Sequence, residues 1–244
     1  QMGIKVMKDN KTGGQTSFDP KQHQNSNNIF GLGINTNRYE GFAKIGYVFP
    51  QKVYKSIGLQ IAAINHDQDS YFGKTIYNAN QKSFYSNLIY QSIIGNTNHK
   101  FRTGLSLQHD NYNELFNTTN YQRTETVAGA FFEYTYTASD KFSVVAGIRG
   151  DNNNLFGAFL TPRLHIRYEP FKGSIFRISA GRGQRTANIF AENTGILVSA
   201  RQLNIIGATT GKAYGLDPEI AWNRGISFDQ SFRLFNRKAS LAID

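Results

Sequence analysis

The chain has 244 residues, enough for one large β domain or two ordinary domains. Its 27 Lys and Arg against 17 Asp and Glu give a formal net charge of +10. That balance suits nucleic acid, an anionic membrane surface or an anionic ligand, without choosing among them. Because cysteine is absent from the sequence, disulfides, thiolate metal sites and cysteine nucleophiles are excluded. The 13 Tyr, 19 Phe and 23 Gly beside 5 Pro favour β structure.

The two ends of the sequence look like cut strands. No run approaches the ~18 apolar residues that a membrane helix requires, and no basic segment followed by an apolar one predicts a signal peptide. The sequence starts inside a predicted strand at Met2–Met7 and stops inside another at Lys238–Ile243. We therefore expect a fragment of a longer protein.

Alternation with a period of two runs along most of the chain. Successive side chains of a strand point to opposite faces, so this pattern predicts long strands with one apolar and one polar face. In one example, Phe101, Leu105 and Leu107 alternate with polar residues. The predicted strands, in chain order, are Met2–Lys8, Asn35–Phe49, Val53–Asp67, Ser83–Ile94, Lys100–Asp110, Gln122–Tyr136, Lys141–Asp151, two strands within Ala158–Gly183, Glu219–Phe232 and Lys238–Ile243.

The connections between these strands alternate in predicted length. Short turns are expected near Pro50, Asn96, Ser139, Phe171 and Asn236. Long loops are expected at 10–33, 68–80, 111–121, 151–157 and 184–217, the last with a short helix after Thr186 as its cap. In a meander, alternate connections lie at opposite ends of the sheet. The short turns then share one rim and the long loops the other, which is typical of outer-membrane barrels.

These patterns predict an all-β fold: an antiparallel up-and-down transmembrane β-barrel, present in part, with roughly eleven strands of a larger barrel. Residues 1–244 are interpreted as part of one β-barrel domain, without a plug domain or the terminal strands. A soluble antiparallel sheet with one solvated face would show a similar alternation, so that alternative stays open.

Three short segments carry a resemblance to a known family. The segment Ile178–Asn193 resembles a late-barrel signature of TonB-dependent outer-membrane receptors, with Arg185, Asn188 and Glu192 at the matching positions. Leu216–Glu219 is similar to the entry to the next strand in that family, and Thr161–Leu164 before the hairpin also looks like it. The Asn, Tyr and Lys usage suggests the Bacteroidetes branch.

The resemblance implies a large plugged barrel in the outer membrane of a Gram-negative cell, driven by contact with TonB. The implied partners are outer-membrane lipid, the protein's own plug domain, TonB and a small nutrient ligand, with no nucleic acid. A plug domain, a TonB-contacting box and a terminal strand ending in an aromatic residue are not recognised in this sequence.

Basic side chains near the resembling segment are the candidate site. They could line the lumen and attract an anionic ligand such as a ferric chelate. The favoured alternative is that they pair with Glu169, with Glu192 or with plug carboxylates, and that Arg185 with Glu192 holds the long loop to the wall. The candidate ligand-binding residues are Arg163, His165, Arg167, Arg182, Arg185, Asn188 and Glu192.

Other motifs predict little chemistry. Gly207–Lys212 resembles a phosphate loop but lacks one residue and the following Ser or Thr. His66–Asp69 and Asp151–Asn154 offer oxygen ligands without the spacing of a calcium loop. The five histidines have no zinc-binding spacing, and no Gly-x-Ser-x-Gly elbow occurs. We therefore expect no catalytic residue, no metal site and no cofactor.

The leading hypothesis is a fragment of a TonB-dependent receptor that takes up a siderophore, cobalamin or an oligosaccharide. The alternative from another class is a soluble β-sheet module that binds polysaccharide or nucleic acid through basic and aromatic faces. A passive porin is disfavoured by the family motifs, and an enzyme is the weakest hypothesis. The sequence does not name the substrate.

Overall fold

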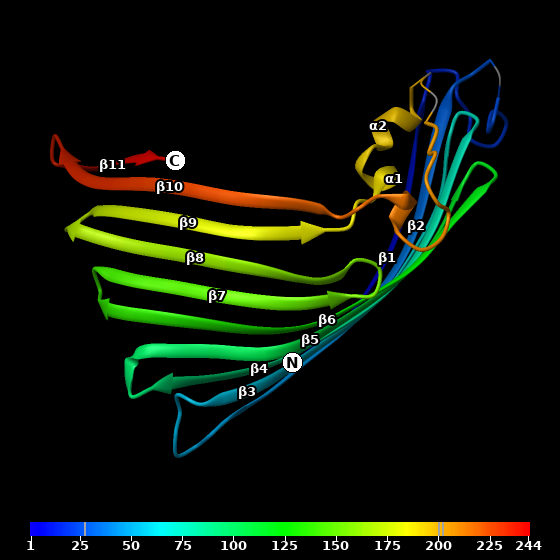
Figure 1. Ribbon diagram of the computed structural model, residues 1–244. Coiled ribbons are helices and arrows are strands. Elements are labelled where there is room, and N and C mark those ends of the chain that lie inside the picture. The colour runs from blue at the N-terminus through cyan, green and yellow to red at the C-terminus, as the bar shows by residue number, and fades with distance from the viewer. Residues whose placement is uncertain (27, 200, 202) are drawn as a thin grey trace.

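The computed structural model describes residues 1–26, 28–199, 201 and 203–244; residues 27, 200 and 202, within the predicted loops 10–33 and 184–217, lie outside it. The described residues form eleven strands in one antiparallel sheet, whose spatial order is the order of the chain. The sheet is a curved open wall with a concave and a convex face (Figure 1). Among the described residues, no helix has both the length and the apolar character needed to cross a membrane.

The strands range from 7 to 21 residues, and the two longest, β5 and β6, lie at the middle of the wall. All eleven predicted strands are confirmed, and several extend further than predicted. Their bounds are β1 Met2–Gly14, β2 Gly31–Val48, β3 Ser56–Phe72, β4 Thr75–Ile94, β5 Asn96–Phe116, β6 Thr119–Ser139, β7 Phe142–Asn153, β8 Gly157–Phe171, β9 Ser174–Arg185, β10 Glu219–Leu234 and β11 Arg237–Ile243.

The backbone register sorts side chains onto the two faces, because residues directly opposite each other in an antiparallel ladder share a face. Leu105 pairs with Ala130, and Ser106 pairs with Gly129. Leu105 is 60% exposed, whereas Ser106 is 7% exposed on the concave face. The predicted apolar alternation is confirmed on the convex face by apolar residues of successive strands that share that face: Ile45, Leu59, Leu88, Leu105, Ala130, Ile148, Ile166, Ile178 and Ile226.

The convex face of β5 and β6 changes character partway along the strands. On β5 the apolar row ends at Leu107 and is followed by His109 and Asn111, and on β6 it begins at Ala128 after Thr126. A lipid-facing band is apolar and ends where the strand leaves the bilayer. The ends of β4, β5 and β6 beyond this level therefore project past the apolar band, and their convex face is mostly polar.

This projection explains two wrong predictions. The loops predicted at 68–80 and 111–121 are strand, closed by two-residue turns at 73–74 and 117–118. Gly73 and Asn117 adopt positive φ of 60° and 52°, which suits tight hairpins. Beyond the band the convex side chains are mostly polar, and the concave ones mix polar with aromatic residues, so the apolar-against-polar alternation disappears and the composition resembles that of a loop.

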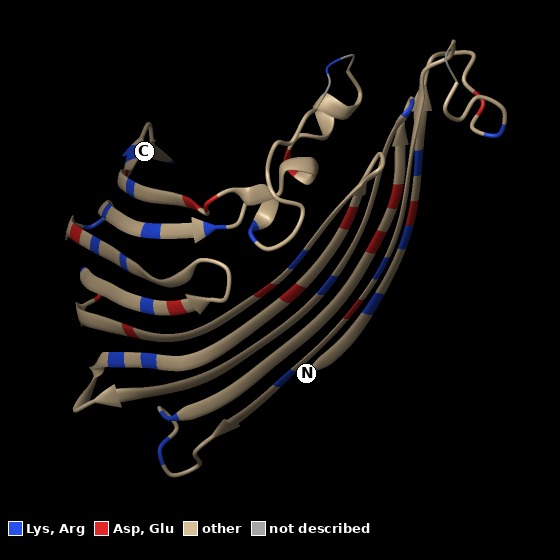
Figure 2. Ribbon diagram, turned by 45° about the vertical axis from the view of Figure 1, so that its right-hand side comes forward, with Lys and Arg blue, Asp and Glu red and all other residues tan. Residues whose placement is uncertain are grey.

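The predicted difference between the two rims holds only in part. The short turns near Asn96, Ser139, Phe171 and Asn236 are confirmed at one rim, whereas the connection at Pro50 is longer than predicted and covers residues 49–55. At the other rim, the connection after β7 shrinks to 154–156, and only 15–30 and 186–218 are long. Figure 2 shows acidic and basic residues interspersed along the strands rather than gathered in the turns.

Residues 186–218, here called the long loop, connect β9 to β10. The loop contains two single-turn helices, α1 Ile189–Glu192 and α2 Thr194–Leu197, and a 3₁₀ turn, Ala213–Gly215. A short helix was predicted here, but its cap is Asn188, whose side chain accepts the amide of Ala191. Although the loop joins β9 and β10, α1 and α2 lie inside the curve of the wall, toward the upper ends of β2–β6 (Figures 1 and 2).

The two-faced wall makes a prediction for β5. Replacing Leu105 with Arg places a charge in the apolar band, at a cost of about 2–4 kcal/mol near the bilayer centre. We expect the fraction of folded protein in outer membranes, measured by heat-modifiable electrophoresis, to fall severalfold. The matched control is Gln108→Arg on the concave face of the same strand, which should fold normally. Equal losses in both variants would contradict the assignment of the faces.

Candidate functional site

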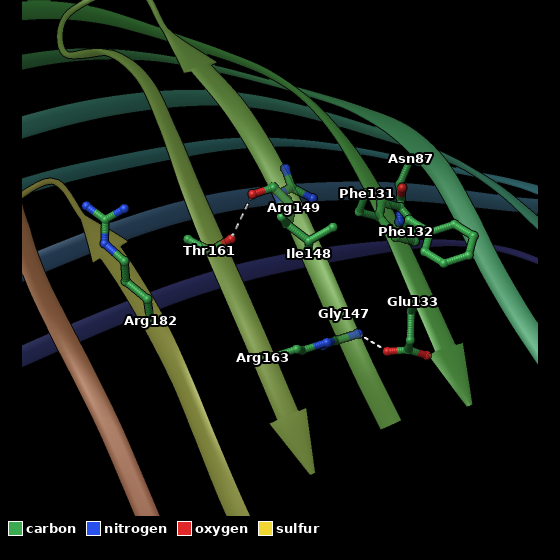
Figure 3. Close-up of a pocket in the computed structure, with 10 residues that line it drawn as sticks. All are labelled: Asn87, Phe131, Phe132, Glu133, Gly147, Ile148, Arg149, Thr161, Arg163 and Arg182. Carbon is green, nitrogen blue, oxygen red and sulfur yellow. Dashed lines mark hydrogen bonds and ion pairs between the residues drawn. The ribbon is translucent and has the colours of Figure 1, made fainter. Parts of the chain in front are cut away.

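Three of the predicted basic residues lie together on the concave face of β8. Arg163, His165 and Arg167 alternate with convex apolar residues, as the sequence predicted. Arg163 forms an ion pair with Glu133 of β6, reaching across Gly147 of β7 (Figure 3). The second carboxylate oxygen of Glu133 lies 3.7 Å from a guanidinium nitrogen of Arg102.

Pairing therefore dominates this cluster. A guanidinium nitrogen of Arg167 lies 2.6 Å from the Glu169 carboxylate, and another donates to the carbonyl of Asp140 at 2.7 Å. The favoured alternative of structural ion pairs is thus confirmed for Arg167 with Glu169. Arg163 also has a carboxylate partner, which the sequence did not identify.

Arg182 lies apart from this cluster. It pairs in register with Trp222, and so shares the face of Leu164 and Ala180 rather than that of Arg163. Its guanidinium donates to the carbonyl of Leu160 at 2.8 Å. The ladder between β8 and β9 ends at Arg163 and Gly181, next to Pro162, which has no N–H to donate. The Arg182 side chain thus bridges the two strands where their backbones separate.

The three residues matched by the family resemblance do meet. Arg185, at the end of β9, forms two hydrogen bonds of 3.0 Å with Glu192 and one of 2.6 Å with Glu219. Asn188 caps α1 and also accepts the hydroxyl of Tyr214 at 3.2 Å. The expectation that Arg185 and Glu192 hold the long loop to the wall is confirmed.

An aromatic cluster fixes the rest of the long loop. Phe190 of α1 is completely buried, although the loop belongs to the rim of an open wall. Its ring lies 4.9–5.4 Å, centre to centre, from four aromatic rings, distances typical of packed aromatic pairs. Three of these rings belong to the wall and one to the loop itself: Tyr77, Phe116, Tyr121 and Tyr214.

A buried carboxylate links the same two parts of the chain. Glu114 of β5 is 1% exposed. One of its oxygens accepts the hydroxyl of Tyr77 at 2.8 Å, and the other accepts Tyr214 at 2.7 Å and Arg123 at 3.1 Å. A buried charge is tolerable only when it is paired and hydrogen-bonded in this way. Tyr214 adopts a φ of 54°, a strained region for a bulky residue that the surrounding contacts maintain.

Sequence analysis missed Glu114, Arg123 and Phe190. Glu114 falls in the segment wrongly predicted as the loop 111–121, and the partners lie far apart in the chain. The long loop also covers an exposed strand edge, because β7 ends at Asn153 and leaves the end of β6 without a neighbour. There the amide of Gln122 donates to the carbonyl of Thr209 at 2.8 Å.

The long loop sets the ionisation of two tyrosines beyond the apolar band. Burial, and then the charge of Glu114, raises the pKa of both Tyr77 and Tyr214 well above the usual 10. Both phenols therefore remain hydrogen-bond donors to Glu114 at neutral pH. Burial, followed by the charge of Asp110, raises the pKa of Tyr112 to about 12.

Two cavities open on the concave face. One, of about 360 Å³, surrounds the Arg163–Glu133 pair and is shown in Figure 3. The other, of about 610 Å³, lies beside the first residues of the long loop and is lined by Asp110, Glu125 and Asp151. Within the described residues, no group of three or more His, Asp or Glu side chains is arranged to hold a metal ion. The charged, amide and aromatic side chains around these cavities can form hydrogen bonds and stacking contacts with a bound ligand.

A curved antiparallel wall with a convex apolar band and a charged concave face defines a β-barrel protein of the membrane type. The sequence model of the TonB-dependent receptor-like β-barrel family matches residues 5–243. The chain therefore belongs to that family, an outer-membrane protein family of Gram-negative bacteria. No curated protein sequence matches the chain.

Solved structures share the fold at low sequence identity. The FrpB iron transporter from Neisseria meningitidis has 13% identity, a TM-score of 0.61 and 94% of this chain aligned. The siderophore receptor PiuA from Acinetobacter baumannii has 12% identity, a TM-score of 0.57 and 86% aligned. The copper transporter OprC has 9% identity, a TM-score of 0.57 and 84% aligned. This chain spans 40% of the length of each of them.

The aromatic cluster predicts how the long loop is held. Phe190→Ala removes the buried ring, and large-to-small changes of this kind cost about 3–5 kcal/mol. We expect the loop to detach, so that trypsin cleaves after Arg201 or Lys212 at least tenfold faster in intact membranes. The control is Val198→Ala, an exposed position of the same loop, which should leave cleavage unchanged. If Phe190→Ala left the cleavage rate unchanged, the aromatic cluster would not be the anchor.

The raised tyrosine pKa values predict an alkaline release of the loop. When the loop detaches, Tyr77 and Tyr214 meet water and ionise above pH ~10, whereas in the attached state they stay protonated. The detached state then binds fewer protons, so attachment should weaken as pH rises above 10. Below that pH these two groups add no pH dependence.

Residues 1–244 contain no cysteine, so in a protein with any cysteine outside them replaced by serine, nitroxides attach to Asn113→Cys and Val198→Cys alone. Their distance distribution, measured by electron paramagnetic resonance, should broaden between pH 9.5 and 11. The same labels in a Tyr77→Phe/Tyr214→Phe background should show a weaker change over that range. An identical change in both backgrounds would contradict the role of the phenols.

Proposed function

We propose that this chain forms part of an outer-membrane receptor that takes up a nutrient ligand by TonB-coupled transport. The observation that carries the proposal is the separation of faces, with an apolar row on the convex side and ion pairs such as Arg163–Glu133 on the other. A membrane barrel needs that arrangement, because its outside meets lipid and its inside meets water or a plug.

The proposal extends to partners. A TonB-coupled barrel of this class has 22 strands and a plugged lumen, and the chain spans 40% of the solved structures with which it was compared. We propose that further strands close the wall at β1 and β11, that a plug domain contacts the charged concave face, and that TonB supplies the energy. Outer-membrane lipid would contact the convex face, and no nucleic acid is involved.

The substrate classes proposed from sequence remain siderophore, cobalamin and oligosaccharide. Among the compared structures, FrpB is named as an iron transporter, PiuA as a siderophore receptor and OprC as a copper transporter. Identities of 9–13% support a shared fold and leave the ligand open. The Asn, Tyr and Lys usage favours a host of the Bacteroidetes branch, with the protein in its outer membrane.

The test is energised uptake in the native host. Three strains are compared: one without the gene for this protein, one without TonB, and the parent strain with both. Each is supplied in turn with a radiolabelled ferric siderophore, cobalamin or malto-oligosaccharide. We expect at least tenfold slower uptake of one ligand in both deletion strains, and recovery of the protein in the outer-membrane fraction. Recovery in the soluble fraction, or uptake that is the same without TonB, would contradict the proposal.

A further inference from the structure

The cavity of about 610 Å³ contains two carboxylates in an unusual arrangement. Asp110 of β5 and Glu125 of β6 are directly opposite each other in the register, on the concave face. They are 4% and 9% exposed. Like charges directly opposite across a ladder are destabilising, and within the described residues neither carboxylate has an ion-pair partner. Electrostatic repulsion between Asp110 and Glu125 therefore destabilises the fold, and packing does not require two carboxylates at this position.

Each of the two carboxylates leaves one oxygen without a donor. One oxygen of Asp110 accepts the amide of Gln108 at 2.6 Å. One oxygen of Glu125 accepts Asn153 at 2.7 Å and Thr186 at 2.6 Å. The second oxygens accept no hydrogen bond from the described residues, and both side chains line the cavity. A ligand that donates hydrogen bonds would fill this gap.

Two of the three arginines that line the cavity are paired with carboxylates. Arg149 donates two hydrogen bonds to Asp151, at 2.6 and 2.7 Å, and one to Ser106. Arg185 is bound to Glu192 and Glu219 at the mouth. The third, Arg182, donates to the carbonyl of Leu160 and has no carboxylate partner among the described residues. Two unpaired carboxylates, Asp110 and Glu125, therefore face one unpaired guanidinium in the lining. The charge distribution disfavours a ferric chelate with net negative charge at this position.

Aromatic side chains complete the lining. Tyr85, Tyr112 and Phe159 border the same cavity. The guanidinium of Arg123 lies 3.7 Å from the centre of the Tyr112 ring, and the Tyr112 hydroxyl accepts Gln81 at 3.1 Å. This lining suits a ligand with two kinds of surface. Its hydroxyl groups would donate hydrogen bonds to the carboxylates, and its C–H groups would pack against the aromatic rings. The volume falls within the roughly 300–1,000 Å³ range of ligand pockets.

We infer that this cavity binds an oligosaccharide that carries no negative charge, with Asp110 and Glu125 accepting hydrogen bonds from its hydroxyl or amino groups. The inference rests on the proposed uptake function and narrows its substrate class. It also reverses the preference for anionic ligands suggested by the net charge of +10, because two of the three arginines that line the cavity are paired with carboxylates.

The test uses the full-length protein, purified in detergent, and isothermal titration with maltohexaose, chitosan hexamer and an anionic ferric tricatecholate. We expect one of the two oligosaccharides to bind, and Asp110→Asn to weaken that binding at least tenfold. Asp110 is the preferred position because it does not contact the long loop, whereas Glu125 does. The matched control is Glu40→Gln, a concave carboxylate of β2 outside the cavity, with an expected change below twofold.

Two results would overturn the inference. One is the absence of binding by both oligosaccharides at millimolar concentration. The other is binding of the ferric tricatecholate with an affinity that Asp110→Asn leaves unchanged or raises. Folding of each variant is checked by heat-modifiable electrophoresis, and Glu125→Gln provides a second variant. If TonB-dependent uptake of the ferric tricatecholate persists in cells, the transport proposal stands while the oligosaccharide inference fails.

Discussion

The structure depends on a single constraint: every strand must present apolar side chains to one side and polar side chains to the other, in register with its neighbours. In a bilayer, backbone groups must bond within the protein, so a wall of paired strands is one of the few available solutions. A shift of one residue would move Leu105 to the concave face and Ser106 to the lipid. The ion pairs of the concave face follow from the same alternation, because they join residues that share that face, either two apart on one strand, as in Arg149–Asp151, or on different strands, as in Arg163–Glu133.

The long loop covers aromatic side chains that the projecting strands would otherwise expose to water. Strands β4, β5 and β6 project beyond the apolar band and carry Tyr77, Phe116 and Tyr121 on the concave face, where water would otherwise meet them. Phe190 and Tyr214 cover these rings, and Glu114 binds both parts of the chain through its two oxygens. The loop is therefore an inner layer of the wall at this rim. Its first residue, Thr186, lines one side of the cavity that contains Asp110 and Glu125.

The sequence predicted those features that depend on residues close together in the chain, and missed those that depend on residues far apart. Alternation such as Leu105 against Ser106 is local and predicted the strands, their faces and the short turns. The projecting ends, at 68–80 and 111–121, were wrongly predicted as loops because their convex side chains are mostly polar and their concave ones mix polar with aromatic residues, which removes the alternation. The pairing of Arg185 with Glu192 was predicted because the two residues are only seven positions apart in the sequence. The hydrogen bond between Glu114 and Tyr214 joins residues one hundred positions apart, so no local pattern indicates it. The carboxylate pair of the cavity depends on the register between two strands and was missed.

The most direct test of the account is the environment of successive side chains along β5. Residues 1–244 contain no cysteine. With any cysteine outside them replaced by serine, single nitroxide labels can be placed one at a time at positions 103–108 of the full-length protein in native-like bilayers. Accessibility to oxygen, which concentrates in lipid, should peak at 103, 105 and 107, and accessibility to a water-soluble nickel chelate should not. Accessibility without a period of two, or nickel access at Leu105 equal to that at Gln108, would contradict a lipid-facing convex surface.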